Sequence, residues 1–167
     1  IFLILDIGGG TLDISILKAI KNNYEVLGTY GENYLGGDDF DEEIVDFVAE
    51  QFLEKNHVDI RFEPSLSVKL KNEAERVKKE LSAKEKAIFY LDIFVKNTHF
   101  TIRESITQQQ LEELLQPYLN KIKSCLDKAI SNSSIQESKI DKVLLVGGST
   151  NVPAVRNLVQ ERFSIPI

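Results

Sequence analysis

Three consecutive glycines, Gly8–Gly10, stand between two apolar segments near the start of the chain, with Asp6 before them and Thr11 and Asp13 after them. Glycine leaves its amide open to a ligand, and consecutive exposed amides bind anions. Two neighbouring carboxylates repel each other unless a cation lies between them. The stretch therefore predicts a phosphate-binding β-turn, with a hydrated Mg²⁺ or another cation at the acids and the Thr11 hydroxyl beside the terminal phosphate or its attacking water.

The stretch has other possible interpretations. Glycines also end strands in many α/β proteins, so a turn without a ligand is the alternative. The sequence has no G-x-x-x-x-G-K-[ST] pattern, and Asp13 occupies the third glycine position of a G-x-G-x-x-G pattern that starts at Gly8. A strand pattern follows the glycines where a Rossmann loop would be followed by a helix.

A second glycine pair, Gly147–Gly148, separates a short buried strand from a helix pattern and is followed by Ser149 and Thr150. This arrangement is typical of an anion or ribose site. It is equally typical of an ordinary helix N-cap supplied by one of the two hydroxyls.

The segment EAERVKKELS places Glu75, Lys78 and Ser82 at helical spacing on one face. Taken by itself, this spacing is typical of a solvated helix face, because Glu–Lys pairs are common on exposed helices.

The elements that must position these residues alternate in type. Strand patterns cover about residues 1–6, 12–17 and 24–31, and a helix with an acidic first turn follows Gly36. A second helix is expected from Pro64, then two strands joined by a turn at Lys96–Asn97. Thr107 and Gln110 form a capping-box signature for a long helix, which Pro117 should kink or split. A strand at 142–146 and a helix after Pro153 complete a mixed α/β layout in which residues 36–106 form an insertion.

Composition bounds the class of protein. The chain has 167 residues, 43% of them apolar and 28% charged, and a net charge of −6. These values exclude disorder and argue against a nucleic-acid-binding surface. No apolar run is long enough for a membrane span and no signal-peptide pattern is present. The single cysteine, Cys125, excludes an internal disulfide and fits a reducing compartment. The absence of methionine and the start within a strand lead us to expect a piece of a longer protein.

Four motifs occur together in one order: LDIGGGTLDISIL, LGGDDFD, NEAERVKKELS and VLLVGGSTNVPAVRNLV. In order and separation they resemble the second lobe of the ATPase domain of DnaK-type chaperones, the seventy-kilodalton heat-shock family, over essentially the whole chain. The resemblance implies an α/β, actin-like ATPase fold. Residues 1–35 and 107–167 would form its ribonuclease-H-like subdomain, and residues 36–106 would form the inserted smaller α+β subdomain.

The resemblance also implies roles for single residues. Gly9, Gly10 and Thr11 correspond to the loop that clasps the β- and γ-phosphates, and Thr11 to the hydroxyl beside the attacking water. Asp6 corresponds to the residue that reaches Mg²⁺ through water, which makes Asp6 and Thr11 the catalytic candidates. Asp13 corresponds to a residue near a bound monovalent cation such as K⁺. The remaining nucleotide contacts implied are Glu75, Lys78, Lys79, Ser82, Gly148, Ser149 and Asn151.

Two positions depart from the family pattern. Asn151 stands where an arginine usually stacks on the adenine, and an asparagine cannot stack as a planar cation. Lys79 stands where some members carry arginine. Both departures indicate a weaker stacking surface for adenine.

By resemblance, the parent protein is an ATPase that converts ATP to ADP and phosphate and uses this cycle to bind and release unfolded polypeptides. The partners implied are a J-domain co-chaperone and a nucleotide-exchange factor that grips the smaller subdomain, in the cytoplasm, with no nucleic acid and no membrane. The chain by itself should be nearly inactive, because phosphoryl transfer needs charge stabilisation from both lobes. The alternatives are a nucleotide-binding regulator or co-chaperone that has lost useful hydrolysis, and a sugar kinase or filament protein of the same superfamily.

Overall fold

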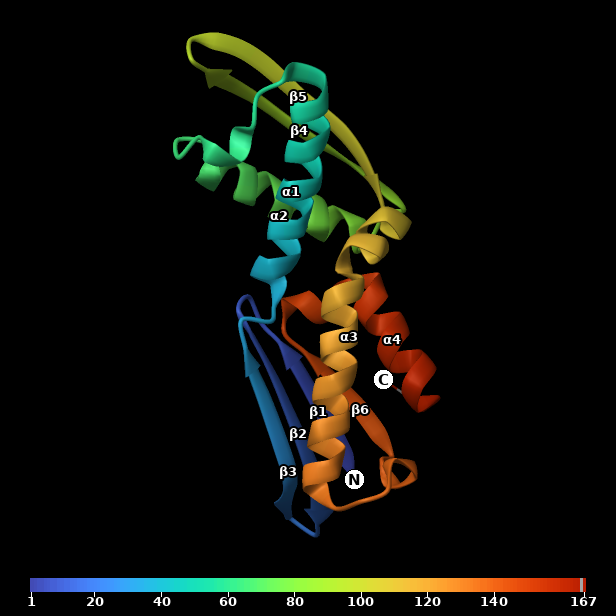
Figure 1. Cartoon of the computed structure of the whole chain (residues 1–167). Helices are drawn as coiled ribbons and strands as arrows, with labels where there is room; N and C mark the ends of the chain where they lie inside the picture. Colours follow the sequence, from blue (N-terminus) through green and yellow to red (C-terminus); the bar gives the residue numbers. More distant parts are fainter. Residues whose placement is uncertain (166) are drawn as a thin grey trace. The chain divides into compact units, whose positions relative to one another are not determined.

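Apolar runs from both ends of the chain form one four-stranded sheet (Figure 1). The computed structural model describes residues 1–165 and 167. The strands are β1 (Phe2–Ile7), β2 (Thr11–Ile20), β3 (Asn23–Asn33) and β6 (Lys142–Val146), in the spatial order β3-β2-β1-β6. β1 pairs antiparallel with β2 and parallel with β6, and β2 pairs antiparallel with β3. The glycine-rich segments 8–10 and 147–148 both follow the carboxyl ends of parallel strands, so they lie at the same edge of the sheet.

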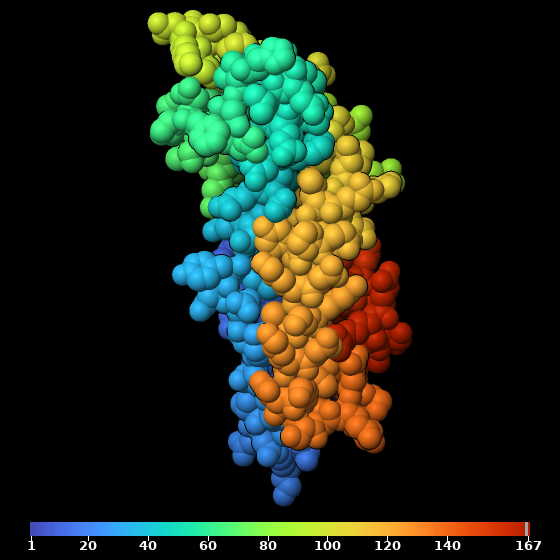
Figure 2. Space-filling model, viewed as in Figure 1, coloured from blue at the N-terminus to red at the C-terminus, as the bar shows by residue number. Residues whose placement is uncertain are grey.

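One face of this sheet is buried and forms the core of the first unit. Along β1 the buried side chains are Leu3, Leu5 and Ile7, at the period of two that a strand imposes. Helix α3 (Gln108–Ser133) lies along the sheet, and an added Cβ on Gly28 of β3 would meet the backbone of Ser133 at 2.6 Å. The exposed side chains of α3 recur at helical spacing and form the orange band in Figure 2.

The chain divides into two compact units. The first contains Ile1–Asp39 and Gln116–Ile167, and the second contains Phe40–Leu115. The divisions fall within helices α1 (Gly37–Asn56) and α3, four residues beyond the boundary predicted at 35/36 and nine beyond the one predicted at 106/107. The first turn of α1 stays with the first unit because the N–H groups of Gly37 and Asp38 bond to the glycine turn at residues 8–10.

The second unit combines helices with a hairpin. It contains most of α1, the short helix η1 (Ile60–Phe62), α2 (Ser67–Leu81), β4 (Lys86–Val95) and β5 (Thr98–Thr107). Lys96 and Asn97 have φ of 48° and 65°, as a two-residue type I′ turn requires, which confirms the turn expected there. The capping box is also confirmed: Gln110 N–H donates to Thr107 Oγ1 at 3.1 Å, and Thr107 N–H donates to Gln110 Oε1 at 3.0 Å.

The helix expected to begin at Pro64 begins later. Pro64 lies in a turn, and α2 begins three residues later at Ser67. Pro117 does not split α3, which continues to Ser133, because the loss of one backbone hydrogen bond is tolerated in a helix whose apolar face is packed. The remaining elements are η2 (Glu137–Lys139), η3 (Gly148–Asn151) and α4 (Pro153–Phe163). None of the helices in the described part of the chain is both long and apolar enough to span a membrane.

Candidate functional site

Residues Gly8–Gly10 form the turn of the β1–β2 hairpin, which we call the glycine turn. The Gly8 N–H donates to the carbonyl of Thr11 at 3.0 Å and closes it. Asp6 and Asp13 are directly opposite each other in the strand register. Side chains at such positions share one face of the sheet with their Cβ atoms about 5 Å apart. The two carboxylates therefore lie side by side next to the turn, on the face opposite the buried Ile7.

All three carbonyl groups of the glycine turn accept hydrogen bonds from the first unit itself. The Gly8 oxygen accepts from Gly37 N–H at 3.0 Å and Ser149 Oγ at 2.8 Å, the Gly9 oxygen accepts from Asp38 N–H at 2.7 Å, and the Gly10 oxygen accepts from Tyr34 N–H at 3.0 Å. The carbonyls are thus directed toward residues 34–38 and 149, and a ligand approaching the turn does not meet them.

The amide groups of the turn have the opposite arrangement. Within residues 1–165 and 167, the N–H groups of Gly9 and Gly10 have no hydrogen-bond acceptor. Both glycines are exposed, so these amides are open to solvent or to a ligand, and successive free amides form a concave anion site. The turn therefore presents two donors to an anion, with the Asp6 and Asp13 carboxylates beside them for a cation.

Two further glycines let the chain pack directly against this turn. An added Cβ on Gly36 would lie 2.5 Å from the Gly9 carbonyl oxygen, and one on Gly147 would lie 2.3 Å from the Ile7 carbonyl oxygen and 2.7 Å from Asp6 Oδ1. Gly147 also has φ of +86°. Any larger residue at either position would displace backbone. The three glycine motifs of the sequence, far apart along the chain, meet at one place in the first unit.

The second glycine turn, residues 147–151, is held by its own side chains. Thr150 Oγ1 donates to the Gly147 carbonyl at 2.8 Å, and the Asn151 side-chain amide donates to the Gly148 carbonyl at 3.2 Å. Ser149 is 6% exposed, and its hydroxyl bonds to the glycine turn. Gly148 is different, because an added Cβ there would meet nothing within 4 Å.

The other predicted contact residues, Glu75, Lys78, Lys79 and Ser82, belong to α2 and its C-cap in the second unit. Lys78 is only 8% exposed, so the solvated-face interpretation is wrong for this residue. Its Nζ lies 2.8 Å from Asp41 Oδ1, in an ion pair whose side chains are 10% and 3% exposed. Glu75 and Lys79 pair at 2.7 Å, and the Ser82 hydroxyl donates to the Lys78 carbonyl at 3.2 Å.

Sequence reasoning gave no role to Asp41. Its position in the sequence could have indicated a buried role. Asp41 stands three residues before Ile44 and seven before Val48, on the apolar face of α1, and a buried acid needs a charged or hydrogen-bonding partner. Asp38 was missed as well. Its carboxylate lies 3.8 Å from where a Cβ on Gly9 would be, so it adds a negative charge next to the glycine turn.

The acids near the glycine turn fit a cation that is only partly held by protein. Among the described residues there is no group of three or more His, Cys, Asp or Glu side chains placed to hold a metal. Mg²⁺ in phosphate sites is usually bound by one or two carboxylates, with waters and phosphate oxygens supplying the rest. Asp6 and Asp13 meet that requirement, and the free amides of the turn would hold the phosphate.

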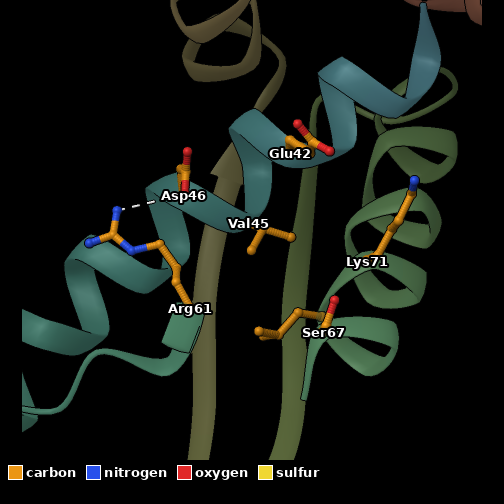
Figure 3. Close-up of a pocket in the computed structure, with 7 residues that line it drawn as sticks. Glu42, Val45, Asp46, Arg61, Ser67 and Lys71 are labelled. Atoms are coloured by element: carbon orange, nitrogen blue, oxygen red, sulfur yellow. Dashed lines mark ion pairs between the residues drawn. The ribbon is translucent and has the colours of Figure 1, made fainter. Parts of the chain in front are cut away.

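A separate hollow of about 230 Å³ lies in the second unit (Figure 3). Figure 3 shows Arg61 directed toward Asp46 of α1, at 3.6 Å, with Ser67 and Lys71 on α2. Arg61 is also paired with Asp59 at 2.8 Å, and these hydrogen bonds raise the pKa of the guanidinium. None of the residues predicted to bind nucleotide lines this hollow.

Comparison with known proteins gives one family. The family model described as Hsp70 protein matches residues 1–166. The chain is 37% identical to the chaperone protein dnaK of Phaeodactylum tricornutum, an alignment that covers 95% of the chain and 26% of that relative. It is 37% and 35% identical to the DnaK chaperones of Thermoplasma acidophilum and Thermoplasma volcanium, over 98% of the chain and 27% of each relative. The chain thus spans about a quarter of the length of the curated relatives it matches.

Proposed function

The chain belongs to the Hsp70 protein family, whose ATPase domain has the actin-like α/β fold, and from that premise we propose that residues 1–167 are the second lobe of a domain that binds and hydrolyses ATP. In this proposal the first unit corresponds to the ribonuclease-H-like subdomain and the second unit to the smaller inserted one. The glycine turn binds the β- and γ-phosphates of ATP or ADP.

One observation carries the proposal. The carbonyls of the glycine turn are all bonded inward, which leaves the N–H groups of Gly9 and Gly10 as donors beside Asp6 and Asp13. Exposed amides occur in any hairpin turn, but a purely structural turn does not need two adjacent carboxylates beside them. A Mg-phosphate group uses both, because its oxygens accept from the amides and its cation offsets the repulsion between the acids.

The roles that we propose for single residues rest on the resemblance to the family. Gly9 and Gly10 orient the phosphates, and the Thr11 hydroxyl orients the attacking water. Asp6 holds Mg²⁺ through water, and Asp13 holds a monovalent cation such as K⁺. The metal, when bound, neutralises charge on the phosphates. The resemblance also assigns adenosine contacts to Glu75, Lys78, Lys79 and Ser82 of the second unit and to Gly148, Ser149 and Asn151 of the first. Lys78 and Ser149 are engaged with Asp41 and Gly8, so their role would be to position their neighbours.

For the parent protein we propose the cycle of a DnaK-type chaperone in the cytoplasm. Hydrolysis and nucleotide exchange alternate the binding and release of unfolded polypeptides, with a J-domain co-chaperone and a nucleotide-exchange factor on the smaller subdomain. The chain by itself has almost no turnover, because charge stabilisation from one side of the γ-phosphate is insufficient.

Calorimetric titration of Mg-ADP tests the proposal, with the complete ATPase domain of the parent and the 167-residue chain measured in parallel. We expect micromolar or tighter binding by the complete domain and weak binding by the chain. Asp13→Ala in the complete domain removes one of the two acids and no amide, and it should weaken Mg-ADP binding. No binding by the complete domain would refute the proposal.

Asn151 favours a second candidate, a nucleotide-binding regulator without useful hydrolysis. Its side chain donates to the carbonyl of Gly148 in its own turn, so it is engaged locally. Replacing it with arginine should tighten Mg-ADP binding by the complete domain if the base lies against this turn. Unchanged affinity in Asn151→Arg, together with no steady-state ATP hydrolysis, would favour the regulator.

A further inference from the structure

Strand β4 has an apolar sequence, and one of its two edges is not paired with another described strand. Within the described part of the second unit it pairs with β5 alone. Its residues 87–91, AIFYL, contain no charge, proline or glycine. Ile88 and Tyr90 are 40% and 50% exposed. A segment of this kind at the edge of a sheet is a template for pairing with another extended chain, and identical segments pair readily with each other.

Two side chains of α2 close this edge. Glu73 Oε1 accepts a hydrogen bond from the Tyr90 N–H at 2.9 Å, and Arg76 Nη2 donates to the Ile88 carbonyl at 2.6 Å. The same two groups bond to each other, with Arg76 Nη2 2.7 Å from Glu73 Oε1 and Arg76 Nε 2.9 Å from Glu73 Oε2.

The arrangement matches one residue of a neighbouring strand. In a parallel pair, a single residue donates its N–H to the carbonyl of one residue on the facing strand and accepts from the N–H two residues further on. Here Arg76 supplies the donor for Ile88, and Glu73 supplies the acceptor for Tyr90. Because both groups are charged, these bonds are stronger than the amide–carbonyl bonds they replace.

The pair is held firmly in place. The Glu73 side chain is 13% exposed. Burial would raise its pKa, but the hydrogen bonds from Arg76 and from the Tyr90 N–H outweigh burial and lower it. Arg76 Nη1 is bonded in addition to Glu80 Oε2 at 2.6 Å, so the guanidinium is fixed on two sides.

We infer that the Glu73–Arg76 ion pair is a built-in substitute for a β-strand, which prevents the β4 edge from pairing with the β4 edge of a second copy of the chain. This role is independent of nucleotide binding. It places a protective device on the same helix that carries Glu75 and Lys78.

The inference is tested by replacing both residues of the ion pair with alanine in the 167-residue chain. In the Glu73→Ala/Arg76→Ala double variant we expect the Tyr90 amide to exchange with deuterium at least about tenfold faster, because its acceptor is lost. We also expect self-association that increases with concentration in sedimentation velocity, over roughly 10–300 μM, where the unmodified chain stays monomeric. Lys84→Ala is the matched control: it removes the ion pair, at 2.7 Å, between Lys84, just beyond α2, and Glu80 of α2, while both bonds to β4 remain, and it should stay monomeric.

A rescue variant locates the association. Adding Ile88→Lys to the double variant places a charge at the β4 edge and should restore the monomer. A double variant that is folded by circular dichroism and monomeric overturns the inference, as does association that Ile88→Lys leaves unchanged. If the double variant does not fold, Arg76→Met replaces it. This change exposes only the Ile88 carbonyl and should cause weaker association, and a folded, monomeric Arg76→Met would overturn the inference as well.

Discussion

Replacement of Gly36 with alanine tests whether backbone contacts shape the glycine turn. The added Cβ would lie 2.5 Å from the carbonyl oxygen of Gly9 and 2.7 Å from its carbonyl carbon. Ordinary contact begins at 3.4 Å, so the two segments must separate by about 0.9 Å. Both neighbours are backbone atoms, so no side chain can move aside to relieve the contact, and the turn itself must shift.

The cost can be estimated from the contacts involved. Overpacking of this kind costs about 1–3 kcal/mol. The shift also weakens the bonds from Gly37 N–H to Gly8 and from Asp38 N–H to Gly9, each worth about 1 kcal/mol. Replacing glycine by alanine also stabilises the folded chain by about 0.4–1 kcal/mol, because it lowers the conformational entropy of the unfolded chain. We therefore expect a net loss of roughly 2–3 kcal/mol, which corresponds to a fall in Tm of about 4–12 °C for a chain of this size.

Gly10→Ala is the matched control, since a Cβ at that position meets nothing within 4 Å. Its Tm should stay within about 2 °C of the unmodified chain. In the complete ATPase domain, however, its methyl group would lie beside the free amides and weaken Mg-ADP binding in calorimetry. Gly36→Ala should reduce both stability and binding. An unchanged Tm in Gly36→Ala would refute the packing argument, and full binding by Gly10→Ala would refute the placement of the phosphates.

Three further predictions concern single side chains. Thr11→Ala in the full-length parent should slow single-turnover hydrolysis at least about tenfold with little change in ATP affinity, and unchanged turnover would remove the role given to its hydroxyl. Lys78→Met should cost about 3–5 kcal/mol in urea unfolding because the buried Asp41 loses its cation, and adding Asp41→Leu should recover most of it; equal stability of Lys78→Met and the unmodified chain would contradict this. The pKa of Glu73 is below its ordinary value of 4.5, since hydrogen bonds from Arg76 and the Tyr90 N–H outweigh the opposing effect of burial. Its contribution to stability is therefore present above about pH 4.5 and is lost as the pH falls through the lowered value, so the unmodified chain should lose more stability than Glu73→Gln between about pH 5 and pH 3.

The sequence by itself determined the local structure and the family. The hairpin around Gly8–Gly10, the Lys96–Asn97 turn and the Thr107–Gln110 capping box depend on residues within a few positions of each other, so their types and spacing are sufficient. Four motifs in order were likewise sufficient to indicate the Hsp70 family. The start of α2 was misplaced at Pro64, and Pro117 does not split α3, because helix packing, which the local pattern does not contain, decides where a helix begins and whether it continues through a proline.

Only the tertiary structure decided which polar groups are engaged within the protein. The Ser149 hydroxyl bonds to the carbonyl of Gly8, 141 residues away, and Lys78 pairs with Asp41 on another helix. The Glu73–Arg76 pair looks like an ordinary helical ion pair in the sequence, and its contact with β4 is visible only in the folded chain. A chain with 26 acidic and 20 basic side chains offers many pairings of comparable energy. Which of them form depends on the distances set when the sheets and helices pack, and the sequence pattern does not contain those distances.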